Sequence, residues 1–164
     1  MIGISRRIDQ LGRIVIPVEV RKKLKIEEGN LLDIKLEDNC IVLSKSEPLK
    51  DFKAYIQDVC SSVTWCHFLV LSDTSVIFAS EHYKKYENEK IVDNFEQNIL
   101  SSNGQKIKIN ICEDLSIDNM FIYSYKLTCF GDKHGYACFL YEKEATEKQK
   151  GAMQFVSDYI SSKL

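Results

Sequence analysis

The sequence predicts an α+β protein of two domains, residues 1–47 and 48–164. All 17 aromatic residues (eight Phe, eight Tyr and one Trp) lie after residue 50. Residues 1–25 hold seven basic and two acidic side chains, a net charge of +5, whereas the whole chain carries −2 and the remainder therefore −7. Apolar residues recur at strand and helix spacings through the second domain. Together these observations predict a small basic module followed by an antiparallel five-stranded sheet with flanking helices.

The basic module is expected to contain two hairpins and a short helix. Its elements are strand-like runs at residues 4–8 and 13–16 around a turn at 9–12, a helix opened by Pro17, and a hairpin of residues 32–36 and 41–43. The turn signals are Gly12 in the first hairpin and Asp38-Asn39 in the second. Pro17 suits a first helical turn because its ring fixes φ, and Val20 and Leu24 continue its apolar face.

A module of this size and composition is not expected to be stable as a monomer. It has no aromatic residue, and such small domains usually need a metal, a disulfide or a partner to bury enough apolar surface. A second copy of the chain is the simplest partner. We therefore expect at least a homodimer, which a second dimerising domain would extend to a homotetramer.

The run GISRRIDQLGRIVIPVEVRKKLKIEEGN, residues 3–30, resembles the swapped-hairpin DNA-binding domain of the AbrB family of transition-state regulators. The resemblance implies a dimeric β-barrel in which two chains interleave their hairpins and align basic side chains along double-stranded DNA. Carried over by position, the DNA-binding residues are Arg6, Arg7, Arg13, Arg21 and Lys22. Lys22 stands where several family members have arginine, which keeps the charge but loses the planar bidentate fork.

The second domain is expected to alternate helices and strands. The expected elements are a helix capped by Ser46 that runs to Val63, a hairpin of residues 68–71 and 76–79, a helix over 91–99, a half-buried strand over 106–112, strands over 120–129 and 135–141, and a final helix. Thr146 and Gln149 form a capping box for that last helix, whose apolar residues are Ala152, Val156, Tyr159 and Ile160.

This element order resembles GAF and PAS sensory domains, and an AbrB-like module followed by a GAF-like domain resembles the SpoVT-like members of the family. The resemblance implies dimerisation through the first and last helices and a role in sporulation or stationary-phase gene control. The segment between the second and third strands is short for a GAF domain, which leaves open whether a small-molecule pocket is retained.

The sequence favours neither a metal site nor an enzyme. Cys60, Cys66 and His67 are the only grouping that hints at a metal, but CxxC and HxxxH spacings are absent. His82 and His134 are interpreted as solvated surface residues, and the six cysteines as buried free thiols. There is no GxGxxG, GxxxxGK, GxSxG or HExxH motif. We expect no cofactor and no catalytic residue.

The sequence therefore predicts a cytoplasmic, nucleoid-associated transcriptional regulator that binds double-stranded DNA as a homo-oligomer. No apolar run is long enough to span a membrane, so no membrane partner is expected. Two alternatives stay open: a MazE-like antitoxin, whose tail would be disordered and poor in aromatics, and a ligand-binding dimer module without DNA function.

Overall fold

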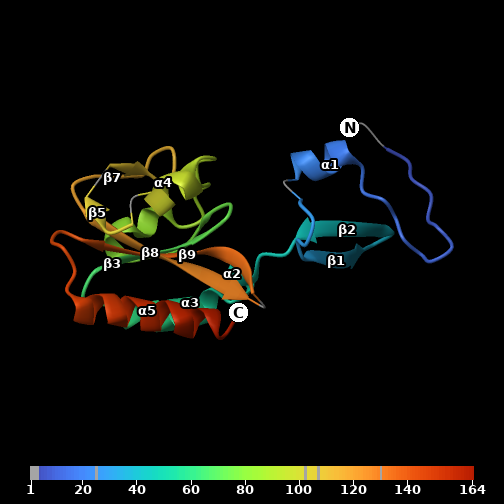
Figure 1. Ribbon diagram of the computed structural model, residues 1–164. Helices are drawn as coiled ribbons and strands as arrows, with labels where there is room; N and C mark the ends of the chain where they lie inside the picture. The colour runs from blue at the N-terminus through green and yellow to red at the C-terminus, as the bar shows by residue number, and fades with distance from the viewer. Residues whose placement is uncertain (1–3, 25, 102, 107, 130) are drawn as a thin grey trace. The chain divides into compact units, whose positions relative to one another are not determined.

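The computed structural model describes residues 4–24, 26–101, 103–106, 108–129 and 131–164, which form two compact units, Met1–Ser46 and Glu47–Leu164 (Figure 1). This division falls one residue before the boundary expected from the sequence. The backbone N–H of Ser46 donates to the Leu31 carbonyl at 3.0 Å, within the first unit. Glu47 instead accepts a hydrogen bond from the Thr74 hydroxyl at 2.9 Å, within the second.

The first unit contains one short helix and one β-hairpin. They are α1, Val18–Lys23, and the antiparallel pair β1, Leu32–Glu37, and β2, Cys40–Lys45. Pro17 occupies the N-cap position of α1 with φ −57°. The hairpin turn lies between Glu37 and Cys40, and Asp38 there adopts a positive φ of 50°, a conformation that Asp tolerates better than most residues. The expected helix and second hairpin are confirmed.

The expected first hairpin is only partly present in the single chain. The turn forms, because Asp9 N–H donates to the Arg13 carbonyl at 3.1 Å and Gly12 N–H to the Asp9 carbonyl at 3.0 Å. The runs at residues 4–8 and 13–16 have no strand assignment, so the expectation of two strands is wrong for one copy. Most of their apolar side chains are exposed and only Ile16 among them is half-buried, and a two-stranded ribbon with so little packing is marginal.

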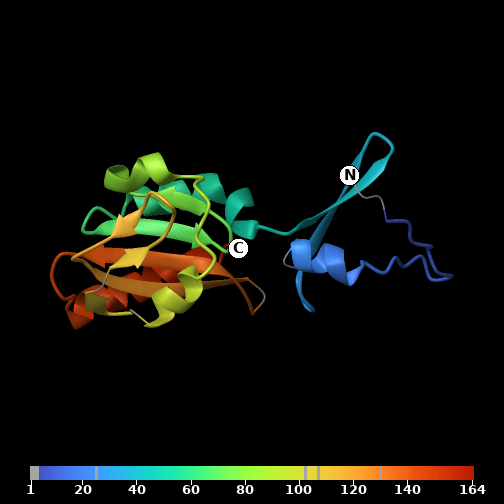
Figure 2. The same cartoon turned by 90° about the horizontal axis from the view of Figure 1, so that it is seen from above.

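The second unit is built on a five-stranded antiparallel sheet, which confirms the expected architecture (Figure 2). Its strands, in the order in which they pair, are β4, Val76–Ala79, β3, His67–Ser72, β9, Asp132–Tyr141, β8, Phe121–Cys129, and β5, Gln105–Lys106. Gly135 lets β9 approach β3 closely, since a Cβ there would lie 2.0 Å from the Leu71 carbonyl oxygen.

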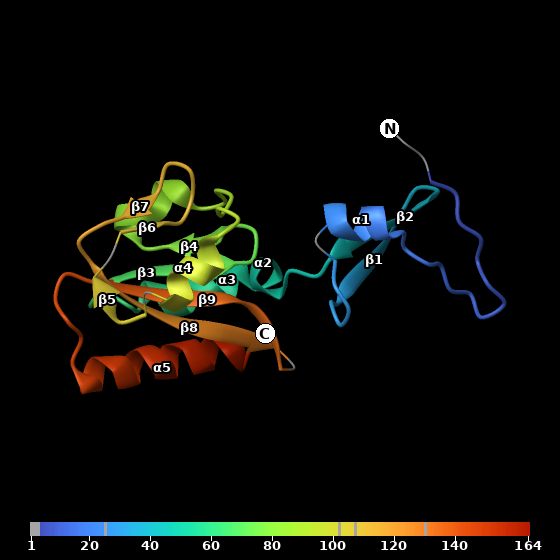
Figure 3. The ribbon, with the colours of Figure 1, turned by 45° about the horizontal axis from the view of Figure 1, so that its top comes forward.

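Two apolar cores lie on opposite faces of this sheet (Figure 3). One face carries α2, Pro48–Asp51, α3, Lys53–Ser61, and α5, Glu147–Ser161. The other carries η1, Glu81–Tyr86, α4, Phe95–Ser101, and the short pair β6, Ile109–Asn110, and β7, Ser116–Ile117. Alternation along β3 divides the cores: Phe68 and Val70 face the first group, Leu69 and Leu71 the second.

Two helices of the second unit differ from the expectation. The first is two helices, because the backbone at Phe52 (φ −94°, ψ 14°) leaves the α conformation between α2 and α3. Its N-cap is Glu47, not Ser46, and no side chain caps it. The second, α4, starts only at Phe95, because Ile91 forms a β-bridge with Cys112. Helical spacing of apolar residues therefore overstated the length of both helices.

The expected strand over residues 106–112 is also wrong as one element. Among the described residues of this run, only β5 pairs with β8, whereas β6 pairs with β7. Ile107 lies outside the described residues. Ile109 and Ile111 are both buried in the same core, which agrees with the alternation, although the alternation does not reveal the break.

The final helix begins as expected but buries a different stripe of residues. The Thr146 hydroxyl accepts from Gln149 N–H, and the Gln149 side chain accepts from Thr146 N–H at 2.9 Å, so the capping box is confirmed. Met153, Ser157 and Ile160 form the buried face. Of the apolar residues expected there, Ala152 and Tyr159 are exposed.

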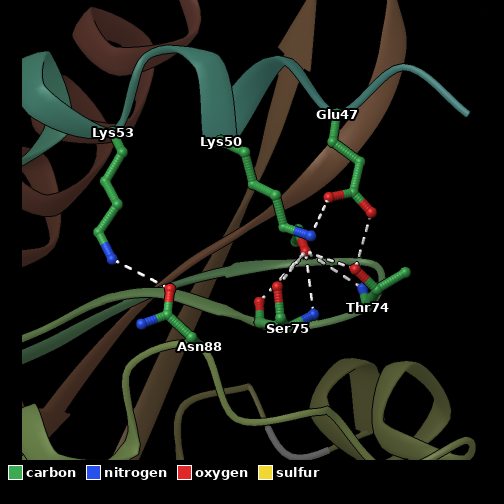
Figure 4. Close-up of polar contacts among 7 residues, drawn as sticks. Glu47, Lys50, Lys53, Thr74, Ser75 and Asn88 are labelled. Atoms are coloured by element: carbon green, nitrogen blue, oxygen red, sulfur yellow. Dashed lines mark hydrogen bonds and ion pairs between the residues drawn. The ribbon is translucent and has the colours of Figure 1, made fainter. Parts of the chain in front are cut away.

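The start of the second unit is tied to the turn between β3 and β4 (Figure 4). Glu47 accepts from Thr74 and also pairs with Lys50. Within the turn, the Ser72 hydroxyl accepts from the backbone N–H groups of Thr74 and Ser75 at 3.1 and 3.0 Å. The boundary between the units therefore falls between two adjacent residues, since Ser46 is hydrogen-bonded in one unit and Glu47 in the other.

No helix among the described residues is both long enough and apolar enough to cross a membrane.

Candidate nucleic-acid interface

The five basic residues expected to contact DNA are all exposed, on two elements of the first unit. Arg6, Arg7 and Arg13 belong to the extended loop around the first turn, and Arg21 and Lys22 lie on α1. Figures 1 and 2 both show this loop standing out from α1 and from the hairpin. One chain therefore presents two separate basic groups.

Charge is divided between the two halves of the first unit. Residues 26–46 contain two lysines, Lys35 and Lys45, against five acids, so this half carries −3 while residues 1–25 carry +5. The basic residues of α1 are in its last turn, where the negative end of the helix dipole favours positive charge. A polyanion would be attracted to the loop and α1 and repelled by the hairpin.

Arg13 is held by Asp9. The Asp9 Oδ2 accepts from Arg13 Nε at 2.8 Å, and Oδ1 accepts from the backbone N–H groups of Leu11 and Arg13, both at 2.9 Å. The backbone hydrogen bond from Arg13, followed by the guanidinium contact, lowers the pKa of Asp9 below its usual value. The carboxylate is therefore ionised at neutral pH and joins the turn to the arginine.

Asp9 is not among the residues predicted from the sequence to contact DNA, although it lies in the predicted turn at residues 9–12. The signal available was its spacing, since an acid four residues before Arg13 and across a turn closed by Gly12 is within reach of the arginine side chain.

Over its described residues, the first unit buries almost no apolar side chains. Among its described residues Ile26 is the single buried apolar side chain. The exposed large apolar residues are Ile4, Ile8, Leu11, Ile14, Val15, Val18, Leu24, Leu31, Ile34, Leu36, Ile41 and Leu43. A soluble domain rarely leaves so large an apolar surface without a partner.

The residues considered for a metal do not assemble a site. No group of three or more His, Cys, Asp or Glu side chains is placed to hold a metal ion within the described ranges. The ring of His67 packs against His82 and Tyr83, with centroids 5.1 and 5.5 Å away. His82 is exposed, as expected for a surface residue, although its ring contacts those of His67 and Tyr83. His134 differs from the expectation, since it lies half-buried in β9.

The cysteines are free thiols, and most are buried. Burial raises the pKa of Cys66 to about 12 and that of Cys112 to about 11, and it also raises the pKa of Cys60 and Cys138. These thiols are therefore protonated and weakly nucleophilic at neutral pH. Cys40 differs from the expectation, since it lies exposed at the start of β2.

Known proteins match this chain over segments of two lengths, one short and one long. Residues 6–51 match the family described as antidote-toxin recognition MazE, bacterial antitoxin. The transition state regulatory protein AbrB of Bacillus subtilis (strain 168) is 48% identical over 46 residues, which are 28% of this chain and 48% of AbrB. Abh of the same organism is 38% identical over 47 residues, 29% of this chain and 51% of Abh.

A longer match extends into the second unit. Stage V sporulation protein T of Bacillus subtilis (strain 168) is 30% identical over 127 residues, which are 70% of this chain and 71% of that protein. The similarity thus covers more than the 46 residues shared with AbrB. On this basis the chain belongs to the AbrB family, in the group that includes stage V sporulation protein T.

Proposed function

We propose that the chain is a transcriptional regulator of sporulation or stationary-phase genes that binds double-stranded DNA. The exposure of Arg6, Arg7, Arg13, Arg21 and Lys22 on a unit that resembles AbrB is the observation that carries this proposal. Such residues neutralise phosphates and release counterions, a force that depends little on base sequence. Sequence preference then depends largely on DNA shape and deformability. The protein acts in the cytoplasm, at the nucleoid, and is not an enzyme.

The DNA-binding form is proposed to be a homodimer of swapped hairpins. Two features of the first unit support a second chain. Its large apolar residues are exposed, and the runs at 4–8 and 13–16 have no strand assignment. Full burial of one Val, Leu or Ile contributes roughly 1.5 to 3 kcal/mol, so several such side chains would offset the cost of association. A second copy would supply strand partners and a core, and would align two sets of basic residues.

The second unit is proposed to be GAF-like or PAS-like and to add a further interface. The strand order β4-β3-β9-β8-β5 and the helices on both faces support this assignment. On α5, Phe155 is 70% exposed and stacks on Tyr159, with ring centroids 6.3 Å apart. This aromatic stripe would let two second units join, which would give a homotetramer. A small-molecule sensing role for this unit is part of the same proposal.

Arg13 provides the test of DNA binding. We expect Arg13→Ala to weaken binding of the full-length protein to duplex DNA and to reduce the slope of log affinity against log salt by about 0.9 for each phosphate that Arg13 neutralises. Lys148→Ala, an equal charge change on the exposed surface of α5, should leave the slope unchanged. Mobility-shift titrations over a salt series measure both. An unchanged slope for folded Arg13→Ala would contradict the role of Arg13.

The antitoxin alternative is favoured by one finding, the match of residues 6–51 to the MazE family. That match ends at residue 51, and the rest of the chain belongs to a packed domain with two apolar cores. A flexible toxin-wrapping tail would lack such cores. Limited proteolysis separates the two, because a tail is degraded early, whereas a folded second unit survives as a resistant fragment.

The third alternative is a ligand-binding dimer whose basic unit only dimerises. It predicts that the full-length protein does not bind duplex DNA even at low salt, where electrostatic binding is strongest. The absence of binding in the titration above would favour it.

A further inference from the structure

We propose that Asp9 is a positioning residue for DNA binding, which fixes the guanidinium of Arg13 before the duplex arrives. This inference rests on the proposed function and deepens it. The residues implied by the family resemblance are all basic, and an acid beside them would ordinarily be expected to weaken attraction to phosphate. The geometry of the turn gives Asp9 the opposite effect.

Both carboxylate oxygens of Asp9 are engaged, and each does a different task. Oδ1 accepts from the backbone N–H groups of Leu11 and Arg13 at 2.9 Å and so fixes the turn. Oδ2 accepts from Arg13 Nε at 2.8 Å and so fixes the side chain relative to that turn. The arginine is therefore restrained at both its backbone and its guanidinium.

The contact engages Nε and spares the two terminal amino groups of Arg13. No acceptor from the described part of the chain contacts these Nη groups. They carry four N–H donors in one plane, which matches the oxygens of a phosphate. A long arginine side chain loses rotamer freedom when it is immobilised at an interface. Because Asp9 imposes part of that order in the free protein, less entropy is lost on binding.

Two simpler roles for Asp9 predict different results. If Asp9 were only an acid near DNA, removing its charge would strengthen binding, since repulsion from phosphate would fall. If it only capped the turn, Asn would replace it, because an amide oxygen can accept the same backbone N–H groups as Oδ1. Positioning of Arg13 requires the second oxygen, and the Asn Nδ2 group cannot accept from Nε.

The decisive experiment is a double-mutant cycle on the full-length protein, with Asp9→Asn, Arg13→Ala and the double variant titrated against one duplex. We expect Asp9→Asn to lower affinity about two- to fivefold for each contacting copy, the range for an exposed ion pair, and to cause no loss once Arg13 is Ala. Asp38→Asn is the matched control, because it removes one acid from the other turn of the same unit, where Asn also tolerates the positive φ. It should not lower affinity.

Arg13→Lys gives a second measurement that does not alter Asp9. It keeps the charge and loses the Nε donor, so a fall in affinity similar to that of Asp9→Asn is expected. Thermal unfolding of each variant shows whether it remains folded.

The outcomes separate the two proposals. If the wild-type protein does not bind the duplex, both the proposed DNA binding and the proposed role of Asp9 are overturned. If the wild type binds and Arg13→Ala weakens it, but Asp9→Asn binds equally well or better, only the role of Asp9 is overturned. An equal loss from Asp9→Asn with and without Arg13 also overturns it, because Asp9 would then act through the turn alone.

Discussion

The two units of this chain differ in where their apolar side chains lie. Among the described residues, all the buried apolar side chains except Ile26 belong to the second unit, whereas most of the large exposed ones belong to the first. The second unit completes two cores, one on each face of its sheet. The first has strands and a helix but encloses almost nothing. This difference supports the proposal that the second unit folds from its own residues, whereas the first is completed by a second copy.

The largest expected effect is a loss of stability of the second unit when one of its core residues is replaced. Phe139 is 0% exposed and packs against Phe68 with ring centroids 4.5 Å apart. We expect Phe139→Ala to lower the free energy of unfolding of this unit by about 3 to 5 kcal/mol, since it removes a buried ring and leaves a cavity. Chemical denaturation followed by the fluorescence of Trp65, whose ring stacks on Phe139, measures it.

That destabilisation should not depend on protein concentration if the second unit is stable alone. A change below about 1 kcal/mol would mean that the unit relies on contacts outside its own core.

The next largest effect is expected when an exposed apolar residue of the β1–β2 hairpin is replaced. It should weaken the proposed dimer and leave a stable monomer almost unchanged. Ile34 is 71% exposed in one chain, so Ile34→Ser should barely change a stable monomer. In the proposed dimer it would cost roughly 1.5 to 3 kcal/mol per buried side chain. Sedimentation over a dilution series should show earlier dissociation.

Lys35→Ser is the control for this prediction, because Lys35 follows Ile34 on the same strand and points to the opposite face. Equal dissociation of the two variants would argue against a dimer interface on the Ile34 face.

The smallest expected effect is a change with pH in the stability that Glu96 gives the second unit. Glu96 accepts hydrogen bonds from Tyr136 at 2.7 Å and Lys133 at 3.0 Å, and Lys133 also pairs with Asp73 at 2.7 Å. The hydroxyl of Tyr136, then Lys133, holds the pKa of Glu96 below its ordinary value of 4.5 despite partial burial. A carboxyl with a lowered pKa stabilises the fold above its ordinary pKa, and this contribution is lost as pH falls through the folded value.

We therefore expect wild type to be slightly more stable than Glu96→Gln at neutral pH and the difference to shrink below pH 4.5. Unfolding midpoints measured from about pH 7 to about pH 3 test this. A difference that grows on acidification would contradict the sign of the shift.

Local signals determined much of the fold. Turn chemistry and alternation were sufficient for the β1–β2 and β3–β4 hairpins, and the capping box marked the start of α5. These features depend on residues close together in the chain, so their spacing is readable. The same holds for the candidate DNA-binding residues, whose density and family resemblance are properties of one short run.

The tertiary structure alone decided which of several allowed arrangements is used. α5 carries two apolar stripes, and packing on the sheet buries Met153 and Ile160 while it leaves Phe155 exposed. Within one run of alternating residues, β5 pairs with β8 in the main sheet, whereas β6 pairs with β7. Periodicity specifies which residues share a face, but it does not specify which surface that face meets, because that choice depends on contacts distant in sequence.

In the first unit, too, some features were predictable from the sequence and others were visible only in the folded chain. Its composition by itself indicated that one copy cannot bury enough surface, and its spacing placed a turn between Asp9 and Arg13. Only the folded turn showed that one carboxylate binds both the backbone and the guanidinium. Composition determines how much must be buried, whereas the positions of individual atoms decide which donor meets which acceptor, since hydrogen bonds depend on distance and angle.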